Sequence, residues 1–375
     1  MQGTATMTTP STPTALDHYT TLGRSGLRVS PFCLGTMTFG LDWGWGTEIE
    51  DSYEIIDAYT EAGGNFLDTA NIYTKGHSEK IIGDHIGRHP ARRDRTVIAT
   101  KFMGNMFPGD PNGGGASRVG IINACEESLR RLQTDHIDLY WMHFWDHRTP
   151  IDETMRALDQ LVRDGKVRHI GFSDTPAWKC AQAQTLADWR NYEPLIALQI
   201  EYSLIERTVE HELIPMAQEL GMGVTPWSPL KGGVLTGKYR RGQDKPGEGR
   251  ATSGWIDNIL TDETYDLIDE IIAVADEASC TPAQAALSWV QRRAGVASSI
   301  IGARTMDQLT ANIDALKVVL TDDQTKRLDD ASTPPNIFPN SFLPYVQNNV
   351  QGGTTINGTP SEPWHMAPQS DDERH

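Results

Sequence analysis

The residues that decide the fold lie in three short stretches, NFLDTANIY at 65–73, TVIATK at 96–101 and IDLYWMH at 137–143. Each contains an apolar run of strand length, and such a run predicts a buried strand. Each run also ends at, or just before, a polar side chain of a type that rarely lies in a core. These polar residues are Asp68, Tyr73, Lys101 and His143.

Five further apolar stretches repeat this pattern, and amphipathic helical stretches separate them. They cover residues 31–37, 169–174, 197–203, 223–228 and 299–303. With the three stretches above, roughly eight alternations of strand and helix predict a parallel (β/α)8 barrel of the TIM-barrel class. Because the carboxyl ends of barrel strands converge on one face, we expect the polar strand-end residues to surround a single small volume.

The two ends of the chain do not follow the alternation. Residues 1–17, rich in Thr and Pro, are expected to be disordered, and residues 18–332 are expected to form the barrel. Within that segment GRSG at 23–26 predicts an N-terminal hairpin that caps the barrel bottom. Residues 333–375 predict an extended C-terminal tail, which we expect at the pocket edge to about Val346 and disordered beyond it.

Composition narrows the classes of partner. The 375 residues carry 33 Lys and Arg against 50 Asp and Glu, and the formal net charge of -17 disfavours nucleic acid and anionic membranes. No apolar run approaches the ~20 residues that span a bilayer. The four cysteines are scattered, with no histidine at metal-ligand spacing, so we expect no metal site and reduced thiols in a cytoplasmic protein.

The three opening stretches resemble the Asp/Tyr/Lys/His region of the aldo-keto reductases. The resemblance runs from about Tyr19 to about Ala331. TPWSPL at 225–230 and GAR at 302–304 make the chain most similar to the branch that includes the potassium-channel beta subunits and many bacterial reductases. The resemblance implies a barrel enzyme that reduces an aldehyde or ketone to an alcohol with a nicotinamide cofactor.

The strand-end residues suit that chemistry. An unperturbed tyrosine has a pKa of about 10, so Tyr73 needs a neighbouring cation that stabilises its phenolate form before it can protonate an alkoxide. Lys101 can supply that charge, and Asp68 is expected to pair with the Lys101 ammonium and hold it in position. His143 can donate a hydrogen bond to the carbonyl oxygen. Taken singly, each residue could instead be structural.

The cofactor is not expected in a Rossmann domain, because no Gly-x-Gly-x-x-Gly follows the first strand. The resemblance implies that the cofactor lies across the barrel top, held by residues from several strand ends. The family's usual residue at the position of Asp174 is Asn, and an aspartate cannot donate to an amide oxygen unless it is protonated. The residues matched to the nicotinamide end are Gly35, Thr36, Met37, Asp68, Ser173, Asp174, Gln199 and Trp227.

Two other segments are matched to the phosphate and adenosine end of the cofactor. Gln308 has a structural alternative, because it ends a capping box that begins at Thr305. A guanidinium at a strand–helix junction suits the 2′-phosphate, so Arg304 favours NADPH over NADH. The irregular stretch 231–257 is expected to be a cofactor or substrate loop. The matched residues are Ser228, Pro229, Leu230, Gly232 and Lys238 in the first segment and Gly302, Arg304, Gln308 and Asn312 in the second.

Aromatic residues near the strand ends are expected to line the substrate pocket. They suit an apolar or ring-bearing carbonyl compound, although the same rings could equally serve packing. The expected substrate-binding residues are Trp43, Trp45, Tyr73, His143, Phe144 and Trp145.

Two other functions stay open. The chain could be a regulatory subunit that binds the nucleotide as a redox sensor. It could also oxidise an alcohol or a sugar in the cell, because the chemistry is reversible. The sequence determines neither the substrate nor the oligomeric state.

Overall fold

The computed structural model describes residues 13–243 and 258–374. The chain divides into two compact units, Met1–Ser332 and Thr333–His375, and each is described by itself below. Residues 1–12, the greater part of the segment expected to be disordered, lie outside the described residues.

Eight parallel strands of the described residues form the sheet of the first unit. They are β3 (Phe32–Gly35), β4 (Phe66–Asp68), β5 (Val97–Phe102), β6 (Ile137–Met142), β7 (Val167–Ser173), β8 (Leu195–Glu201), β9 (Gly223–Trp227) and β10 (Ser299–Gly302). Their order in the sheet is β10-β3-β4-β5-β6-β7-β8-β9. The sheet closes at β9, where Val224 N donates to Gly295 O at 2.9 Å and Ala297 N donates to Val224 O at 2.8 Å. The predicted (β/α)8 barrel is confirmed.

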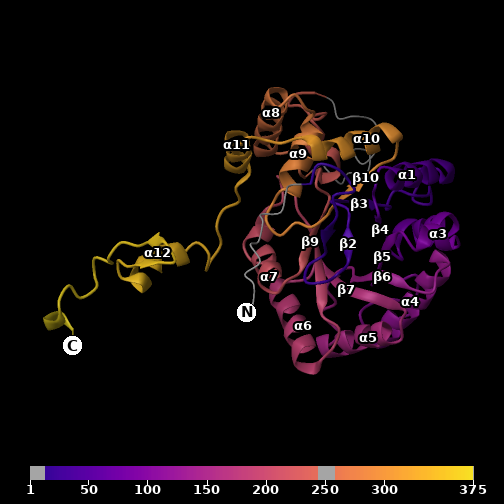
Figure 1. The fold of residues 1–375 in the computed structure, drawn as a ribbon, viewed down its shortest axis with the longest axis horizontal. Helices are drawn as coiled ribbons and strands as arrows, with labels where there is room; N and C mark the ends of the chain where they lie inside the picture. The colour runs from indigo at the N-terminus through magenta and orange to yellow at the C-terminus, as the bar shows by residue number, and fades with distance from the viewer. Residues whose placement is uncertain (1–12, 244–257, 375) are drawn as a thin grey trace, which may run out of the picture. The chain divides into compact units, whose positions relative to one another are not determined.

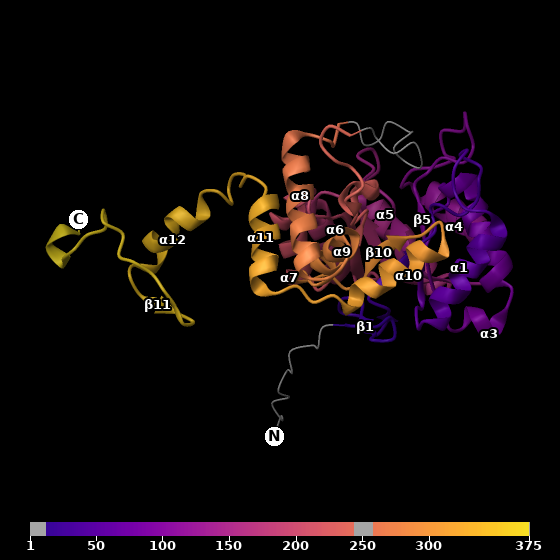
Figure 2. The same ribbon diagram turned by 90° about the horizontal axis from the view of Figure 1, so that it is seen from above.

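Helices form a ring around the strands (Figure 1), and Figure 2 shows the same arrangement from a second direction. In α5, for example, an apolar stripe faces inward, with Ile151, Met155 and Leu158 buried at i, i+4 and i+7. The helices of the first unit are α1 (Ile49–Glu61), α2 (His77–Ile82), α3 (Pro90–Arg93), α4 (Arg118–Leu132), α5 (Ile151–Arg163), α6 (Ala177–Arg190), α7 (Leu213–Glu219), α8 (Asp262–Glu277), α9 (Pro282–Gln291), α10 (Met306–Asp314) and α11 (Asp322–Ser332).

The strands pack apolar residues on both of their faces, because alternate side chains of a strand point to opposite sides. One apolar cluster lies between the strands and the helices. A second apolar cluster contains residues of the strands and of the N-terminal hairpin but no residue of the helices above, so we place it inside the barrel. Its strand members include Cys33, Phe66, Val97, Ala99, Leu139, Trp141 and Ala197.

An N-terminal hairpin closes the amino end of the barrel, as the sequence predicts. Strands β1 (Thr20–Thr21) and β2 (Arg28–Val29) pair antiparallel. Between them Gly23 has a φ of +58°, and a Cβ there would lie 2.2 Å from the carbonyl oxygen of Ile196 and 2.6 Å from that of Gly221. Only glycine fits a turn that approaches two backbone carbonyls so closely.

The second unit contains more regular structure than the sequence predicts. Helix α12 (Leu343–Gln351) and a small hairpin of β11 (Thr355–Ile356) and β12 (Thr359–Pro360) fall largely in the stretch expected to be disordered. The helix has local boundary signals, a proline in its first turn and the left-handed Gly352 directly after it. The expectation that the tail forms a pocket edge stays a prediction.

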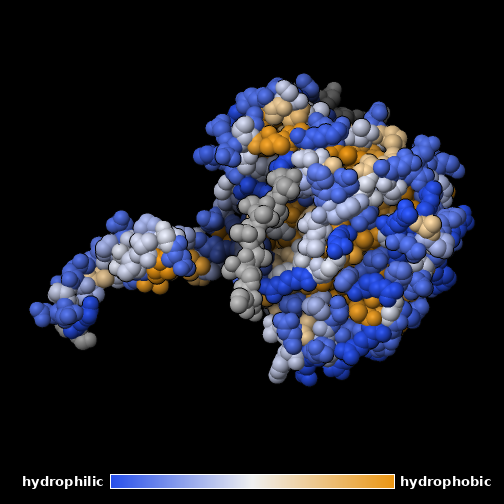
Figure 3. Space-filling model, in the orientation of Figure 1, coloured by the Kyte–Doolittle hydropathy of each residue, from blue (hydrophilic) through white to orange (hydrophobic). Residues whose placement is uncertain are grey.

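Hydrophilic residues cover most of the barrel exterior on the face that Figure 3 shows. Among the described residues, no helix is long and apolar enough to cross a membrane. In the same residues, no group of three or more His, Cys, Asp and Glu side chains could hold a metal ion. All four cysteines are free thiols, and Cys280 is the half-buried one.

Candidate active site

Strand alternation carries three of the polar strand-end residues into the barrel interior. Asp68, Lys101 and His143 each lie two positions after a residue of the interior cluster, so they extend the same inward-facing rows at the carboxyl ends of β4, β5 and β6. Tyr73 begins the short 3-10 turn η1 (Tyr73–Gly76) that follows β4. The inward neighbours are Phe66, Ala99 and Trp141.

A buried ion pair forms the base of the site. Lys101 is fully buried, and its ammonium donates to Asp68 Oδ2 and, at 2.8 Å, to the carbonyl oxygen of Thr69. The other carboxylate oxygen of Asp68 accepts from Gln199 Nε2 at 3.0 Å. Because both charges have lost water, each depends on these partners.

Tyr73 is the third group around the Lys101 ammonium, which lies 3.4 Å from the Tyr73 hydroxyl and 4.9 Å from the centre of its ring. Burial raises the pKa of Tyr73, while Lys101 opposes the rise and Asp68 adds to it. The sequence predicts a pKa of Tyr73 that Lys101 lowers. The cation acts in the expected direction, but desolvation of the phenol outweighs it.

His143 lies beside Tyr73, with ring centres 5.7 Å apart in an edge-to-face arrangement. Burial, with a smaller contribution from the Lys101 charge, lowers the pKa of His143 to about 3. The imidazole is therefore neutral at pH 7 and keeps one N–H donor. Its Nδ1 is buried and has no hydrogen-bond partner among the described residues.

Aromatic rings continue from Tyr73 and His143. Trp43 lies 6.3 Å from Tyr73 and 5.7 Å from Trp45 between ring centres, and Phe144 lies 5.4 Å from His143. The structure thus joins five of the six residues expected to bind substrate in one run of ring contacts.

The sixth expected substrate residue, Trp145, makes a ring contact outside this run. The ammonium of Lys179 in α6 lies 5.0 Å from the centre of the Trp145 ring, and the ring packs against the cluster between strands and helices. A cation over an aromatic face is itself a stabilising arrangement. Packing is therefore the role of Trp145 that these contacts support.

Asp174 follows β7 and joins it to the end of β9. Its φ is +40°, a left-handed conformation that Asp and Asn tolerate best after Gly. Trp227 Nε1 donates to Asp174 Oδ1 at 3.0 Å. Asp174 as a whole residue is exposed at the strand ends, but the protein surrounds its carboxyl group. Desolvation raises the pKa of this carboxyl group to about 6; Trp227 opposes the rise and Glu201 adds to it. Near neutral pH a fraction of Asp174 is therefore a hydrogen-bond donor.

The remaining residues matched to the nicotinamide end are mostly engaged by the protein. Gln199 has its amide nitrogen on Asp68, which leaves its oxygen as the available group. The hydroxyl of Thr36 is buried and donates to the backbone oxygen of Asp68 at 3.0 Å. Ser173 is buried at the end of β7, and Gly35 and Met37 are half-buried around the end of β3.

The loop after β9 has an irregular backbone. Ser228, Lys231, Gly232 and Gly233 all have positive φ, and Gly232 N donates to Ser228 Oγ at 3.2 Å. The loop itself uses its backbone N–H groups, since Lys231 N donates to Ser228 O at 2.8 Å and Gly233 N donates to Leu230 O at 2.9 Å. A Cβ at Gly233 would lie 3.2 Å from Lys238 Nζ, so this cation lies over the same loop. Residues 244–257 of the expected cofactor loop lie outside the described residues.

At the β10–α10 junction, some polar side chains form hydrogen bonds within the described part of the protein and one does not. Gln308 N donates to the Thr305 hydroxyl at 3.3 Å, as in a capping box. The side-chain oxygen of Gln308 accepts from the backbone N of Arg304 at 2.9 Å, whereas in a capping box it would accept from the backbone N of Thr305. Asn312 donates to Gly302 O at 3.1 Å. In the part of the chain that the structure describes, the Arg304 guanidinium has no hydrogen bond or ion pair.

An ion pair that the sequence did not predict lies beside the site. Lys231 Nζ contacts Glu201 Oε1 at 2.7 Å, and Glu201 is one of the groups that raise the pKa of Asp174. A signal for it was present, because Glu201 lies two residues after Gln199 on the same face of β8.

Comparison with known proteins gives a match over most of the chain. A family model described as the Aldo/keto reductase family matches residues 31–333. The chain is 40% identical to the uncharacterized oxidoreductase YrpG of Bacillus subtilis (strain 168), over 86% of this chain and 96% of that relative. It is 35% identical to the norsolorinic acid reductase of Aspergillus flavus, over 90% of this chain and 86% of the relative. It is 34% identical to the aryl-alcohol dehydrogenase [NADP(+)] of Phanerodontia chrysosporium, over 88% and 90% respectively.

Proposed function

This chain belongs to the aldo/keto reductase family, and on that premise we propose that it reduces an aldehyde or ketone to an alcohol with NADPH as the hydride source. The observation that carries the proposal is the buried pair of Asp68 and Lys101 in contact with the half-buried Tyr73, which continues into His143 and a run of aromatic rings. Burying a charge pair costs desolvation free energy, and titratable groups with strongly shifted pKa values cluster at functional sites. The complete series favours an enzyme over a regulatory subunit.

Each polar residue has a distinct role in this proposal. Tyr73 donates its hydroxyl proton to the carbonyl oxygen as negative charge develops there. Burial opposes the charge on Lys101, but Asp68 and Tyr73 outweigh it and raise the pKa of Lys101, so the ammonium stays charged and stabilises the phenolate that remains. His143, neutral at pH 7, donates its N–H to the carbonyl oxygen and orients it.

The residues at the barrel top fit a nicotinamide dinucleotide phosphate. The Lys238 ammonium near Gly233 suits the pyrophosphate, and the side of Gly302 where a Cβ would stand is open within 4 Å. Arg304 is available for a 2′-phosphate, and the side chain of Asp174 can accept from an amide nitrogen or, when protonated, donate to an amide oxygen. The bound cofactor would supply the hydride.

The substrate that suits the site is an aromatic carbonyl compound. Trp43, Tyr73, His143 and Phe144 offer ring faces and edges near the proton donor, and aromatic pairs gain energy beyond simple burial. Two of the relatives are named for norsolorinic acid and for aryl alcohols, which supports the same class.

Oxidation of an aryl alcohol with NADP+ is the second candidate. It is favoured by the relative named aryl-alcohol dehydrogenase [NADP(+)]. The same groups would serve, with the Tyr73 phenolate accepting the alcohol proton. Comparing turnover of aromatic aldehydes with NADPH and of the matching alcohols with NADP+ separates the two directions.

Replacement of Tyr73 by Phe tests the proposal. The variant keeps most of the side-chain volume and loses the proton, so turnover of aromatic aldehydes should fall by about 10²- to 10⁴-fold. NADPH affinity, measured by fluorescence titration, should stay nearly the same. Tyr53→Phe is the matched control, because Tyr53 stacks on His85 outside the barrel interior. Near-normal turnover of Tyr73→Phe would show that another group donates the proton.

A further inference from the structure

The turn that carries Tyr73 has an unusual backbone. Thr74, Lys75 and Gly76 follow Tyr73 in succession, with φ values of +45°, +58° and +88°. Glycine adopts this left-handed region readily, but a β-branched residue such as threonine is a rare occupant of it. Strained backbone of this kind persists only where neighbouring groups hold it, and it clusters at functional sites. The contacts of Thr74 therefore show what holds the turn.

The hydroxyl of Thr74 joins the turn to two other segments. Thr74 is fully buried, and its Oγ1 donates to the carbonyl oxygen of Phe39 at 2.8 Å and accepts from Ser78 N at 2.9 Å. Phe39 is also buried and belongs to the loop of residues 36–48 between β3 and α1, whereas Ser78 lies in the first turn of α2. The hydroxyl thus uses both its proton and a lone pair to fix the turn.

The loop that Thr74 contacts also carries Trp43. The Trp43 ring lies edge-on to the Tyr73 ring, with 6.3 Å between the ring centres. A second link joins the same segments, because Asp42 Oδ2 lies 2.7 Å from His77 Nδ1 at the start of α2. The stretch of loop that precedes Trp43 is therefore tied to the Tyr73 turn and to α2 at two points.

The hydrogen bonds of this region continue to the backbone of Asp68. Ser78 Oγ donates to Thr36 O at 2.8 Å, and Thr36 N donates to Asp68 O at 2.9 Å. The Tyr73 hydroxyl lies 3.4 Å from Lys101 Nζ, which is at the long end of the hydrogen-bond range. A small rotation of the turn would therefore break the contact between Tyr73 and Lys101.

We propose that Thr74 is a positioning residue, whose hydroxyl holds Tyr73 at Lys101 and holds Trp43 against Tyr73. This role of Thr74 rests on the proposed function, in which Tyr73 donates the proton. Thr74 is fully buried, so it acts through the residues that it holds. One turn then sets both the proton transfer and the recognition of an aromatic substrate.

Two variants that lack the Thr74 hydroxyl test this role. Thr74→Val keeps the shape of the side chain, and Thr74→Gly also relieves the backbone, so the glycine variant covers the case in which valine prevents folding. In both, kcat for reduction of an aromatic aldehyde with NADPH should fall by about 10- to 100-fold and KM for the aldehyde should rise, because Tyr73 and Trp43 are displaced. The affinity for NADPH, measured by fluorescence titration, should stay nearly the same. Thr74→Ser keeps the hydroxyl and should restore most of the kcat.

Thr154→Val is the matched control. Thr154 in α5 is 1% exposed, and its hydroxyl donates to Ala116 O at 3.0 Å, so this variant also loses a buried hydroxyl bond. It should lower the free energy of unfolding, measured with urea, and leave kcat unchanged. If Thr74→Val and Thr74→Gly lower kcat no more than Thr154→Val does, Thr74 is a structural residue only and the proposal is overturned.

Crystal structures of Thr74→Val and Thr74→Gly with NADP+ give a readout besides turnover. The Tyr73 hydroxyl should lie beyond hydrogen-bond distance of Lys101 Nζ in both. A Tyr73 hydroxyl that stays at Lys101 without the Thr74 hydroxyl would also overturn the proposal. Failure of the proposed function gives a different result, since Tyr73→Phe would then keep near-normal turnover wherever Tyr73 lies in the Thr74 variants.

Discussion

Replacing Lys101 with Met separates the charge of this residue from its shape. In the structure the buried ammonium donates to Asp68, to the carbonyl oxygen of Thr69 at 2.8 Å and to the Tyr73 hydroxyl at 3.4 Å. Met fills a similar volume without charge. The Asp68 carboxylate, 2% exposed, would be left with Gln199 as its one side-chain donor among the described residues.

Removing one partner of a buried ion pair typically costs about 3–5 kcal/mol of unfolding free energy, whereas replacing both partners by apolar groups is often neutral or stabilising. Lys101→Met should therefore lose about that amount, and the double variant Lys101→Met with Asp68→Leu should recover most of it. Both variants should lose turnover by at least about 10²-fold, because Lys101 is the group that opposes the burial-driven rise in the pKa of Tyr73.

Urea unfolding, followed by tryptophan fluorescence, measures the stabilities, and NADPH consumption across pH measures the activities. A single variant as stable as the parent would show that removing Lys101 leaves no uncompensated charge at Asp68. Substantial turnover of Lys101→Met with unchanged pH dependence would show that another cation acts on Tyr73.

Three further variants probe the same site. The pKa of His143 is lowered to about 3 from 6.5, so between these pH values the unfolded chain binds more protons than the folded chain. The free energy of unfolding should therefore fall as pH falls through that window, at up to about 1.4 kcal/mol per pH unit. In urea titrations, His143→Asn should show a shallower dependence of the unfolding free energy on pH. Because the pKa of Asp174 is raised to about 6, the affinity for NADP+, measured by fluorescence titration, should change with pH near 6. Asp174→Asn should remove that change if Asp174 contacts the cofactor amide. Arg304→Ala should weaken NADPH by about 10- to 100-fold and leave NADH nearly unaffected; equal loss for both cofactors would contradict a 2′-phosphate contact.

The sequence by itself determined the strands and the order of the polar residues along them. The apolar runs at 65–70, 96–101 and 137–143 correspond to β4, β5 and β6 within a few residues, because a buried strand needs a local apolar run and a polar residue marks its end. Such signals repeat over a few residues and can be read without knowing the rest of the fold.

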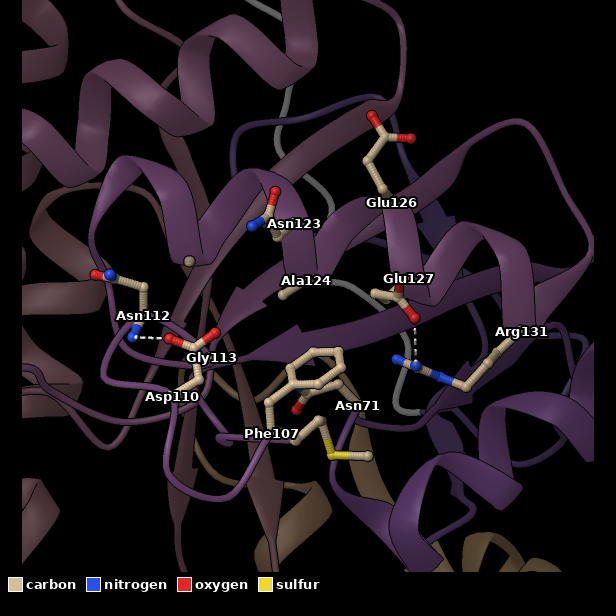
Figure 4. Close-up of a pocket in the computed structure, with 12 residues that line it drawn as sticks. Asn71, Phe107, Asp110, Asn112, Gly113, Asn123, Ala124, Glu126, Glu127 and Arg131 are labelled. Atoms are coloured by element: carbon tan, nitrogen blue, oxygen red, sulfur yellow. Dashed lines mark hydrogen bonds and ion pairs between the residues drawn. The ribbon is translucent and has the colours of Figure 1, made fainter.

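Only the tertiary structure decided the electrostatics and the empty space. The raised pKa of Tyr73 depends on how completely other elements bury it, and the bond from Trp227 to Asp174 joins the ends of two different strands. A cavity lined by α4 and the loop before it (Figure 4) likewise depends on the gap between these segments, with Asn71 and Arg131 brought together from distant parts of the chain. These quantities are distances between segments remote in sequence. Packing of the whole barrel sets them, and no local pattern of residues encodes them.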